Sequence, residues 1–428
     1  MKENSNKVCI VGLGYVGLPL VSAILSNTSD FVYGIDTCDE RCAQISLSQL
    51  PGTLSKFNNV LRNNSSRIKV SNSHQQGVIY DFVLICVPTP LYVDYTPDLR
   101  FVEFAFAGII DNVSDETTII LESTVYPGCT EELYSKYFDG LELSPQLGFS
   151  PEREDPGNKS FTVSTTPKII SASSAAALSR ISAFYRRFVD SVVPCPSIKC
   201  AELAKLLENT QRSVNISLMN ELKLYTTKIG VDIYDVVNAA STKPFGFMPY
   251  YPGPGIGGHC IPIDPSYLYW SAKRIGIDLT FIQHSVSINT EISDHITNDL
   301  ISICNSRQIS PFSSTLLLAG LSYKKNIDDM RSSPSLPLFL GLKIHFRNIF
   351  LYDPLVTSQS LPTQYNSPNT KFIQDLDVQD ISSTGQHIIT LVITDHDCID
   401  FNLLSSISTL VFDTRGRFQA DSTKYFRL

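Results

Sequence analysis

The sequence lacks the features that would direct the protein to a membrane or to nucleic acid. Its longest apolar runs, such as 82–87 and 316–318, are far too short to cross a bilayer. The N-terminus has neither the apolar stretch nor the cleavage site of a signal peptide. Lys and Arg are scattered, and 34 of them stand against 42 Asp and Glu, a formal net charge of −8. Nucleic acid and anionic membranes are therefore poor candidates for partners.

The ten cysteines form no C-x-x-C pair. Two closer pairs, Cys38/Cys42 and Cys195/Cys200, have no second pair or histidine cluster beside them, so we expect no metal site. Scattered free cysteines are typical of a reducing compartment, and we expect a cytoplasmic protein.

Short apolar runs predict an α/β fold. The runs are continuous rather than alternating, which indicates parallel strands buried on both faces. In the first half, strands are expected at 8–11, 31–36, 82–87, 118–121 and 168–170. A helical period of some thirty residues starts near 197 and stops at Gly230, followed by helix-like stretches at 233–240, 265–274 and 280–300. From about 308, strands are expected again at 315–319, 348–352, 387–393 and 409–412.

We predict two Rossmann-like parallel-sheet domains joined by a central helical domain with a long spine helix. The expected boundaries are residues 1–196, 197–300 and 301–428. No internal repeat is visible in the sequence, because the turn that begins at Gly320 lacks the three-glycine pattern described next.

A glycine motif follows the first expected strand, at Gly12-Leu13-Gly14-Tyr15-Val16-Gly17. The first glycine makes a tight turn, the second lets the backbone approach a pyrophosphate, and the third allows close helix–strand packing. Asp36 ends the next expected strand about twenty residues later, where it can hydrogen-bond a ribose diol. We therefore expect NAD to bind here, at Gly12, Gly14, Tyr15, Val16, Gly17 and Asp36. Arg41 keeps NADP open as the alternative.

A loop rich in glycine and proline, residues 245–264, holds one thiol, Cys260, and one carboxylate, Asp264. A thiol becomes a nucleophile only beside a base or a positive charge, and Asp264 could accept a proton from water or an alcohol. An inert buried cysteine is the alternative, but the Gly257-Gly258 pair and the carboxylate favour a catalytic thiol. His259 is adjacent in the sequence, where neighbouring side chains usually diverge.

Lys205 and Asn209 are four residues apart on the expected spine helix, so they project from the same face. Both can donate hydrogen bonds to an oxyanion. A solvated helical face is the alternative interpretation.

These segments together resemble the UDP-glucose/GDP-mannose dehydrogenase family over essentially the whole chain. The matching segments, in family order, are GLGYVG (12–17), ESTVYPG (122–128), SPER (150–153), AELAKLLENTQR (201–212), the Cys260 loop and GLSYKKNIDDMR (320–331). The resemblance implies an NAD-dependent enzyme that oxidises the C6 alcohol of a nucleotide sugar to a carboxylate. It also implies that the first predicted domain binds NAD, the central one forms a homodimer, and the last binds the UDP-sugar.

Within the family, three segments resemble the branch that acts on UDP-N-acetylhexosamines in surface-polysaccharide pathways such as capsule and O-antigen synthesis. They are residues 150–157, 208–212 and 257–268. UDP-glucose dehydrogenases typically carry an acidic residue four positions after the equivalent of Glu152, where this chain has Pro156; Glu154 and Asp155 are the nearby candidates for a substitute. UDP-N-acetylglucosamine is the expected substrate, and UDP-N-acetylmannosamine, UDP-N-acetylgalactosamine and UDP-glucose are the alternatives.

The resemblance implies a thioester mechanism. After one hydride leaves C6 for NAD, Cys260 attacks the aldehyde to give a thiohemiacetal. A second hydride transfer leaves a thioester, which water hydrolyses. Lys205 and Asn209 would stabilise the oxyanion, and Asp264 would order or deprotonate water. Glu152 and Thr124 would serve the hydrolytic water.

The resemblance also assigns binding residues. Besides the glycine motif, the expected cofactor contacts are Arg41, Pro88, Thr89, Thr124 and Arg331. The expected substrate contacts are Glu152, Arg153, Lys205, Asn209, Gly257, Gly258, Tyr323, Lys324 and Arg415. Two hypotheses from other functional classes stay open at this point: a single-step dehydrogenase that does not need Cys260, and a non-enzymatic NAD sensor or scaffold.

Overall fold

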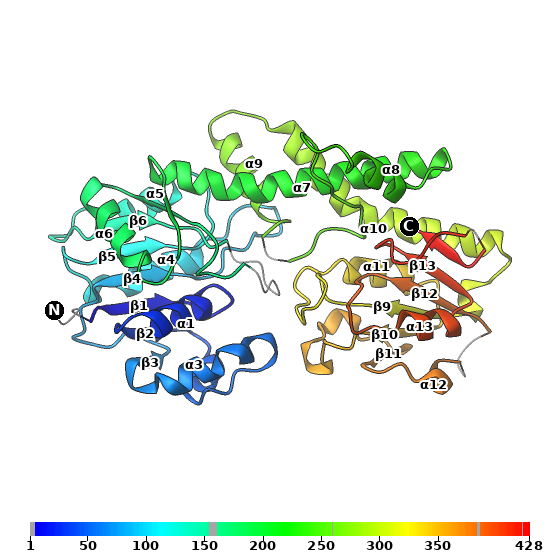
Figure 1. Ribbon diagram of the computed structural model, residues 1–428, viewed down its shortest axis with the longest axis horizontal. Coiled ribbons are helices and arrows are strands. Elements are labelled where there is room, and N and C mark those ends of the chain that lie inside the picture. Colours follow the sequence, from blue (N-terminus) through cyan, green and yellow to red (C-terminus); the bar gives the residue numbers. More distant parts are fainter. Residues whose placement is uncertain (1–4, 154–160, 259, 383–385, 422) are drawn as a thin grey trace. The chain divides into compact units, whose positions relative to one another are not determined.

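The computed structural model describes residues 5–153, 161–258, 260–382, 386–421 and 423–428. The chain forms two compact units, the first built from residues 1–208 and 266–278 and the second from 209–265 and 279–428. In Figure 1 the strands of the first unit lie in the blue-to-green part of the chain, and those of the second in the yellow-to-red part. The predicted division into three domains stays a prediction.

The first unit contains one eight-stranded sheet with the order β3-β2-β1-β4-β5-β6-β7-β8. Neighbouring strands are parallel except β6 and β7, which are antiparallel. The strands are β1 (Lys7–Val11), β2 (Phe31–Ile35), β3 (Ile68–Ser71), β4 (Phe82–Ile85), β5 (Thr118–Leu121), β6 (Gln146–Phe149), β7 (Lys168–Ala172) and β8 (Val192–Pro194). The inner strands β4 and β5 are buried throughout, as their continuous hydrophobicity predicts.

Helices connect the strands of this sheet. They are α1 (Gly17–Asn27), α2 (Asp39–Ser46), α3 (Asn58–Asn63), α4 (Arg100–Gly108), α5 (Cys129–Phe138) and α6 (Ala175–Tyr185). Helix α1 buries Leu18, Leu20 and Ile24 in the same hydrophobic core as Val8 and Ile10 of β1. Strand order changes direction between β1 and β4, and a ligand of an open α/β sheet binds outside the carboxyl ends of the strands at such a point.

The second unit contains a six-stranded parallel sheet with the order β11-β10-β9-β12-β13-β14. Its strands are β9 (Thr315–Ala319), β10 (Asn348–Tyr352), β11 (Thr370–Ile373), β12 (Ile388–Val392), β13 (Leu410–Asp413) and β14 (Tyr425–Arg427). Its helices include α8 (Ile233–Ala240), α10 (Thr280–Ser306), α11 (Ser335–Leu342), α12 (Val378–Ser382) and α13 (Phe401–Ile407).

The expected spine helix is α7 (Ile198–Lys228), and the division between the two units falls within it. Gly230 follows the helix with a φ of +70°, the left-handed conformation in which glycine ends helices, so the expected stop at Gly230 is confirmed. Helix α9 (Asp264–Arg274) follows the Cys260 loop. No helix among the described residues is long and apolar enough to span a membrane.

The predicted fold class, two Rossmann-like parallel sheets with a helical middle region, is confirmed. The strands that the sequence did not predict are short, and most of them lie at or near a sheet edge: β3, β6, β8, β11 and β14. The edge strands β3 and β11 are only half-buried, so they lack the continuous apolar run that marks an inner strand.

Candidate active site

The turn after β1 leaves room for a phosphate at one of its three glycines. A Cβ atom on Gly12 would lie 2.7 Å from the Cys86 carbonyl oxygen, and one on Gly17 would lie 1.9 Å from the Gly12 oxygen. A Cβ atom on Gly14 would meet nothing within 4 Å. Gly12 and Gly17 are therefore required by packing, whereas Gly14 presents open backbone beside the N-terminus of α1, as a pyrophosphate requires.

Asp36 lies beside this turn, directly after β2. Its carboxylate accepts hydrogen bonds from the backbone N–H groups of Leu13 and Cys38, both at 2.9 Å. A carboxylate has about four lone-pair sites, so two remain for a ribose diol. On α2, Nη1 of Arg41 is buried and has no hydrogen-bond partner. The open glycine, the positioned carboxylate and the unpaired guanidinium nitrogen together fit a dinucleotide.

The other predicted cofactor residues of this unit follow β4 and β5 at the same edge of the sheet. Pro88 and Thr89 come after β4, and the Thr89 carbonyl accepts a hydrogen bond from the Tyr267 hydroxyl at 3.2 Å. Thr124 is half-buried after β5. Its neighbour Ser123 donates to the Val87 carbonyl at 2.7 Å, which ties the two loops together.

Glu152 belongs to a buried charge cluster at the end of β6. Lys168 Nζ lies 2.9 Å from Glu152 Oε2 and 2.6 Å from Glu122 Oε2. The Tyr185 hydroxyl donates to the other oxygen of Glu122. The sequence did not single out Lys168, Glu122 or Tyr185 for any role.

Lys205 is buried on α7, and its charge favours the ionised form of Glu152. One turn earlier, Glu202 is fully buried and accepts hydrogen bonds from the backbone N–H groups of Gly128 and Thr130. Glu202 thereby caps α5 and fixes the loop that carries Thr124. Within the first unit, the structure thus brings together the loop that carries Thr124, the Glu152 carboxylate and the Lys205 side chain. Glu202 is a further residue that the sequence analysis did not identify.

Arg153, a predicted substrate contact, is already engaged within the first unit. Its guanidinium pairs with Glu208 at 2.7 Å and donates to the Pro167 carbonyl at 2.9 Å. Glu154, Asp155 and Pro156, which bear on the choice of sugar, lie outside the described residues, as does His259.

Cys260, Asp264 and Asn209 come together in the second unit. The Cys260 carbonyl accepts a hydrogen bond from the Asp264 N–H at 2.8 Å, which forms the turn into α9. Asn209 Nδ2 donates to Asp264 Oδ2 at 2.5 Å. The half-buried thiol therefore precedes by one turn a carboxylate that is buried and held by an amide.

The Gly257-Gly258 pair packs closely against the loop after β9. A Cβ atom on Gly257 would lie 2.5 Å from the Tyr323 Cβ, and one on Gly258 would lie 2.9 Å from the Tyr323 ring. The Gly258 N–H donates to the Arg331 carbonyl at 3.1 Å, and the Arg331 guanidinium pairs with Asp329 at 2.6 Å. Both glycines are needed for this packing, whatever they contact in a substrate.

Arg415 follows β13 and reaches the same glycine-rich loop. Its Nε donates to the Ile393 carbonyl at 2.6 Å, and its Nη1 lies 3.0 Å from the position of a Cβ on Gly253. Lys324 is half-buried in the loop after β9. The second unit thus gathers the predicted substrate residues Gly257, Gly258, Tyr323 and Arg415 around one loop.

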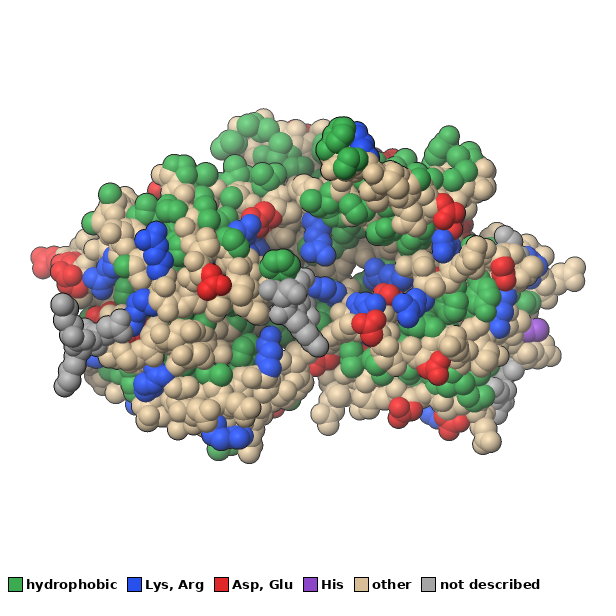
Figure 2. Space-filling view, viewed as in Figure 1, with side chains coloured by type: hydrophobic (Ala, Val, Ile, Leu, Met, Phe, Trp, Pro, Cys, Tyr) green, Lys and Arg blue, Asp and Glu red, His purple; other side chains and the backbone are tan. Residues whose placement is uncertain are grey.

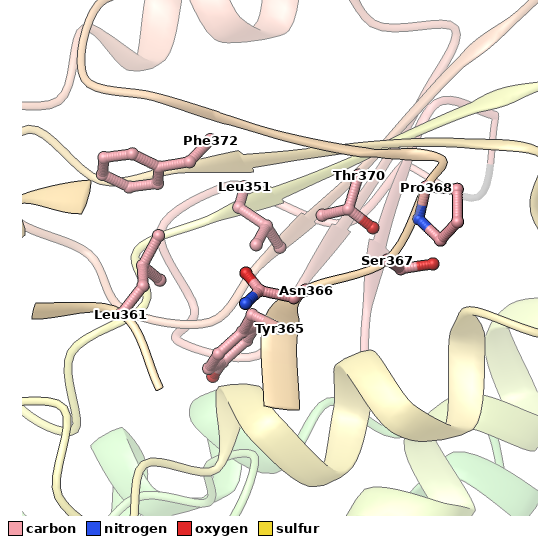
Figure 3. Close-up of a pocket in the computed structure, with 8 residues that line it drawn as sticks. All are labelled: Leu351, Leu361, Tyr365, Asn366, Ser367, Pro368, Thr370 and Phe372. Carbon is pink, nitrogen blue, oxygen red and sulfur yellow. The ribbon is translucent and has the colours of Figure 1, made fainter. Parts of the chain in front are cut away.

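A separate cavity of about 350 Å³ lies over β10 and β11 of the second unit (Figure 3). Its lining residues are Leu351, Leu361, Tyr365, Asn366, Ser367, Pro368, Thr370 and Phe372. The Tyr365 hydroxyl pairs with Ser335 Oγ of α11 at 2.7 Å. No predicted site residue lines this cavity, so we assign it no part in the site.

Comparisons with known proteins agree with this organisation. Three family models match: the NAD binding domain of the UDP-glucose/GDP-mannose dehydrogenase family at residues 6–189, its central domain at 199–291, and its UDP binding domain at 317–420. Protein CapL of Staphylococcus aureus is 33% identical over 358 residues, 82% of each chain. The UDP-N-acetyl-D-glucosamine 6-dehydrogenase of Pseudomonas aeruginosa is 33% identical over 365 residues, 84% of this chain and 85% of that protein. The structure of a UDP-D-ManNAc dehydrogenase from Pyrococcus horikoshii has a TM-score of 0.84 at 25% identity, covering 97% of this chain and 96% of that one.

The dinucleotide turn of the first unit and the thiol–carboxylate loop of the second define a nicotinamide-dependent dehydrogenase. The chain belongs to the UDP-glucose/GDP-mannose dehydrogenase family. It is therefore an NAD-dependent UDP-sugar dehydrogenase, and the predictions of NAD as cofactor and of oxidoreductase activity are confirmed.

Proposed function

We propose that the protein oxidises the C6 alcohol of a UDP-N-acetylhexosamine to the carboxylate, with UDP-N-acetylglucosamine as its substrate. The observation that carries the proposal is the Cys260–Asp264–Asn209 group, because a thiol is needed only when the aldehyde is oxidised further. The choice of sugar rests on the resemblance of 150–157, 208–212 and 257–268 and on the name of the Pseudomonas aeruginosa relative. The product would supply surface-polysaccharide synthesis in the cytoplasm.

Each group has a distinct part in the proposed reaction. NAD, when bound, takes a hydride from C6 in each of the two oxidations. Cys260 Sγ bonds to the aldehyde carbon and holds it as the thiohemiacetal and then the thioester. Lys205 and Asn209 donate hydrogen bonds to the oxygen that carries the developing negative charge. Asp264 and Glu152 accept protons, and Thr124 orients the hydrolytic water.

The binding roles are part of the same proposal. Gly12, Gly14, Tyr15, Val16, Gly17, Asp36, Arg41, Pro88, Thr89, Thr124 and Arg331 would contact NAD. Glu152, Arg153, Lys205, Asn209, Gly257, Gly258, Tyr323, Lys324 and Arg415 would contact the UDP-sugar. Arginine suits a diphosphate because its planar guanidinium bonds two oxygens at once.

The substrate is tested by comparing kcat/KM for UDP-N-acetylglucosamine with that for the manno and galacto isomers and UDP-glucose. We expect the gluco N-acetyl sugar to be preferred by about tenfold or more, the scale of one well-placed contact. UDP-N-acetylmannosamine is the second candidate, because the similar Pyrococcus horikoshii structure is that of a UDP-D-ManNAc dehydrogenase. Preference for any other sugar would overturn the choice of sugar. As the control for the thioester step, Cys260→Ser should yield no acid from any of the four sugars.

We also propose that the protein forms a homodimer through α7. Five large side chains are exposed along this helix at helical spacing, Leu203, Leu207, Leu218, Leu222 and Tyr225, and Ile229 directly after the helix is exposed as well. Figure 2 shows hydrophobic side chains gathered over the face where Figure 1 places α7 and α8. Such a stripe is costly to leave in water. Light scattering should give twice the chain mass for the wild type and the single-chain mass for Leu218→Lys; a monomeric wild type would overturn the proposal.

A further inference from the structure

The reversal of β7 brings a lysine to the edge of the sheet where the site lies. In the antiparallel pair of β6 and β7, Gly148 lies opposite Ala172 and Phe149 opposite Ser171. The same register, continued past the end of β6, places Lys168, the first residue of β7, opposite Glu152. In a parallel neighbour, the first residue of the strand would lie at the other edge of the sheet.

The Lys168 ammonium is buried between two carboxylates. Nζ lies 2.6 Å from Glu122 Oε2 and 2.9 Å from Glu152 Oε2, and it also donates to the Pro151 carbonyl at 3.3 Å. The side chains of Lys168, Glu122 and Glu152 are 3%, 0% and 8% exposed. All three ammonium donors therefore have acceptors, and Lys168 can fix the position of both carboxylates.

The charges of this cluster do not balance, because one ammonium faces two carboxyl groups. Burial raises the pKa of Glu122 to about 7, although Lys168 attracts its charged form. Burial alone would also raise the pKa of Glu152, but the charge and hydrogen bond of Lys168 outweigh it and lower that pKa. As pH falls toward about 7, the cluster therefore takes up its first proton on Glu122, whereas Glu152 stays ionised.

Other titratable groups face the cluster from the neighbouring elements. Tyr185 at the end of α6 donates to Glu122, and Cys86 after β4 is a buried thiol whose pKa burial raises. Lys205 on α7 adds a second positive charge that favours ionised Glu152, and the Arg153 N–H donates to Glu152 Oε1 at 2.7 Å. Lys168 contacts both carboxylates.

We propose that Lys168 is the positioning residue of Glu152: it keeps that carboxylate ionised and fixes one of its oxygens for the thioester-hydrolysis step. The inference rests on the proposed function, in which Glu152 serves the water that attacks the Cys260 thioester. In that step the water oxygen bonds to the acyl carbon and the C–S bond breaks. The water proton passes to the Glu152 carboxylate and is later released to solvent, and the thiolate is restored. A protonated Glu152 cannot take that proton. Neither hydride transfer requires Glu152 as a proton acceptor.

Lys168→Met therefore separates hydrolysis from oxidation. At neutral pH we expect a rapid burst of two NADH per active site, followed by steady turnover slowed about a hundredfold, the usual size of a lost proton acceptor. Intact-protein mass spectrometry should show the acylated chain. The acidic limb of the kcat–pH profile should move up by about one unit or more, because a close opposite charge lowers a carboxyl pKa by about that much. Lys168→Arg, which keeps the charge, should restore much of kcat.

A matched control removes a different cation from a different buried pair of the same unit. Arg187 pairs with fully buried Asp30, with Nη1 2.6 Å from Oδ2 and Nη2 2.9 Å from Oδ1. Asp30 precedes β2, at the edge opposite Asp36. Arg187→Met should lower the thermal midpoint as a broken buried pair does, without an NADH burst and without a shift of the acidic limb.

A double variant covers the case in which Lys168→Met does not fold. Glu122→Gln/Lys168→Met removes one carboxyl group together with the ammonium group and keeps Glu152. Infrared spectra at pH 7 should show a protonated carboxyl band that Glu122→Gln alone lacks, and this readout does not require activity. The same band in both variants, or a Lys168→Met enzyme without a burst and with the wild-type acidic limb, would overturn the inference. Failure of the proposed function is distinct, because the wild type itself would then release only one NADH per sugar.

Discussion

The two sheets contain the same turn, but its aspartate can still accept hydrogen bonds from a ligand in one unit and is fully engaged by the protein in the other. Gly12 after β1 and Gly320 after β9 both have positive φ, and each donates its N–H to the last residue of the neighbouring strand at 2.8 Å. Asp36 accepts from the Leu13 N–H at 2.9 Å, and Asp353 accepts from the Leu321 N–H at 2.7 Å. The structure therefore contains an internal repeat that the sequence does not show.

The carboxylates of the two turns have different surroundings. Asp353 is fully buried and accepts further hydrogen bonds from the N–H groups of Ser322, Leu355 and Val356. His396 Nδ1 accepts from the Asn326 N–H, so Nε2 carries the proton and faces Asp353 Oδ2 at 3.1 Å. The second turn thus has no free carboxylate oxygen, and no helix starts after it until α11. The same turn thus presents a carboxylate with open acceptor sites in the first unit and a carboxylate with a purely structural part in the second.

The largest expected difference comes from glycines in the two turns. Gly14→Val should weaken NAD binding by about a hundredfold or more, because its side chain would fill the open space of the pyrophosphate. The free energy of unfolding of the Gly14→Val variant should stay within about 0.5 kcal/mol of that of the wild type. NAD titration by calorimetry and denaturant unfolding measure the two quantities.

Gly320→Ala is the counterpart in the second unit. Its Cβ would lie 2.0 Å from the Thr394 oxygen at a φ of +80°, so we expect a loss of about 3 kcal/mol or more of stability. Weakened NAD binding without loss of stability for Gly320→Ala would contradict the comparison.

The second-largest expected difference is between substitutions of the two aspartates, Asp36 and Asp353. Asp353→Asn places amide donors among backbone donors and should cost about 2–3 kcal/mol of unfolding free energy. Asp36→Asn should instead raise the KM for NAD about tenfold, with little change in stability. Steady-state kinetics and denaturant unfolding curves of both variants would show whether Asp353→Asn changes mainly the stability and Asp36→Asn mainly the KM for NAD, or whether both variants change both quantities.

The smallest effect is a pH dependence confined to the second turn. Burial alone would raise the pKa of Asp353, but hydrogen bonds from His396 and the backbone outweigh it, and the pKa is below the ordinary 3.8. A carboxyl group with a lowered folded-state pKa stabilises the fold above its unfolded pKa and loses this contribution as pH falls. The stability difference between wild type and Asp353→Asn should be constant from pH 7 to about 4 and shrink below that. Unfolding curves at pH 7, 4 and 3 measure it, and a difference that grows on acidification would contradict the account.

The sequence predicts the parts of this comparison that depend on composition and short motifs. Continuous apolar runs identified the inner strands, and the GLGYVG motif with Asp36 identified the first turn. The second turn was not predicted as a counterpart because its similarity lies in backbone geometry and in a distant aspartate, Asp353, rather than in glycine spacing. Lys168 was missed because the antiparallel direction of β7 is not encoded in its five-residue sequence, Lys-Ile-Ile-Ser-Ala. A lysine at the start of a buried strand was the only available signal.

The central claim is that one enzyme carries out both oxidations through a thioester. We would measure NADH released per molecule of limiting UDP-N-acetylglucosamine, with the manno, galacto and glucose nucleotides alongside. The account predicts two NADH and one carboxylate product per sugar. One NADH per sugar, with an aldehyde as the product, would contradict it.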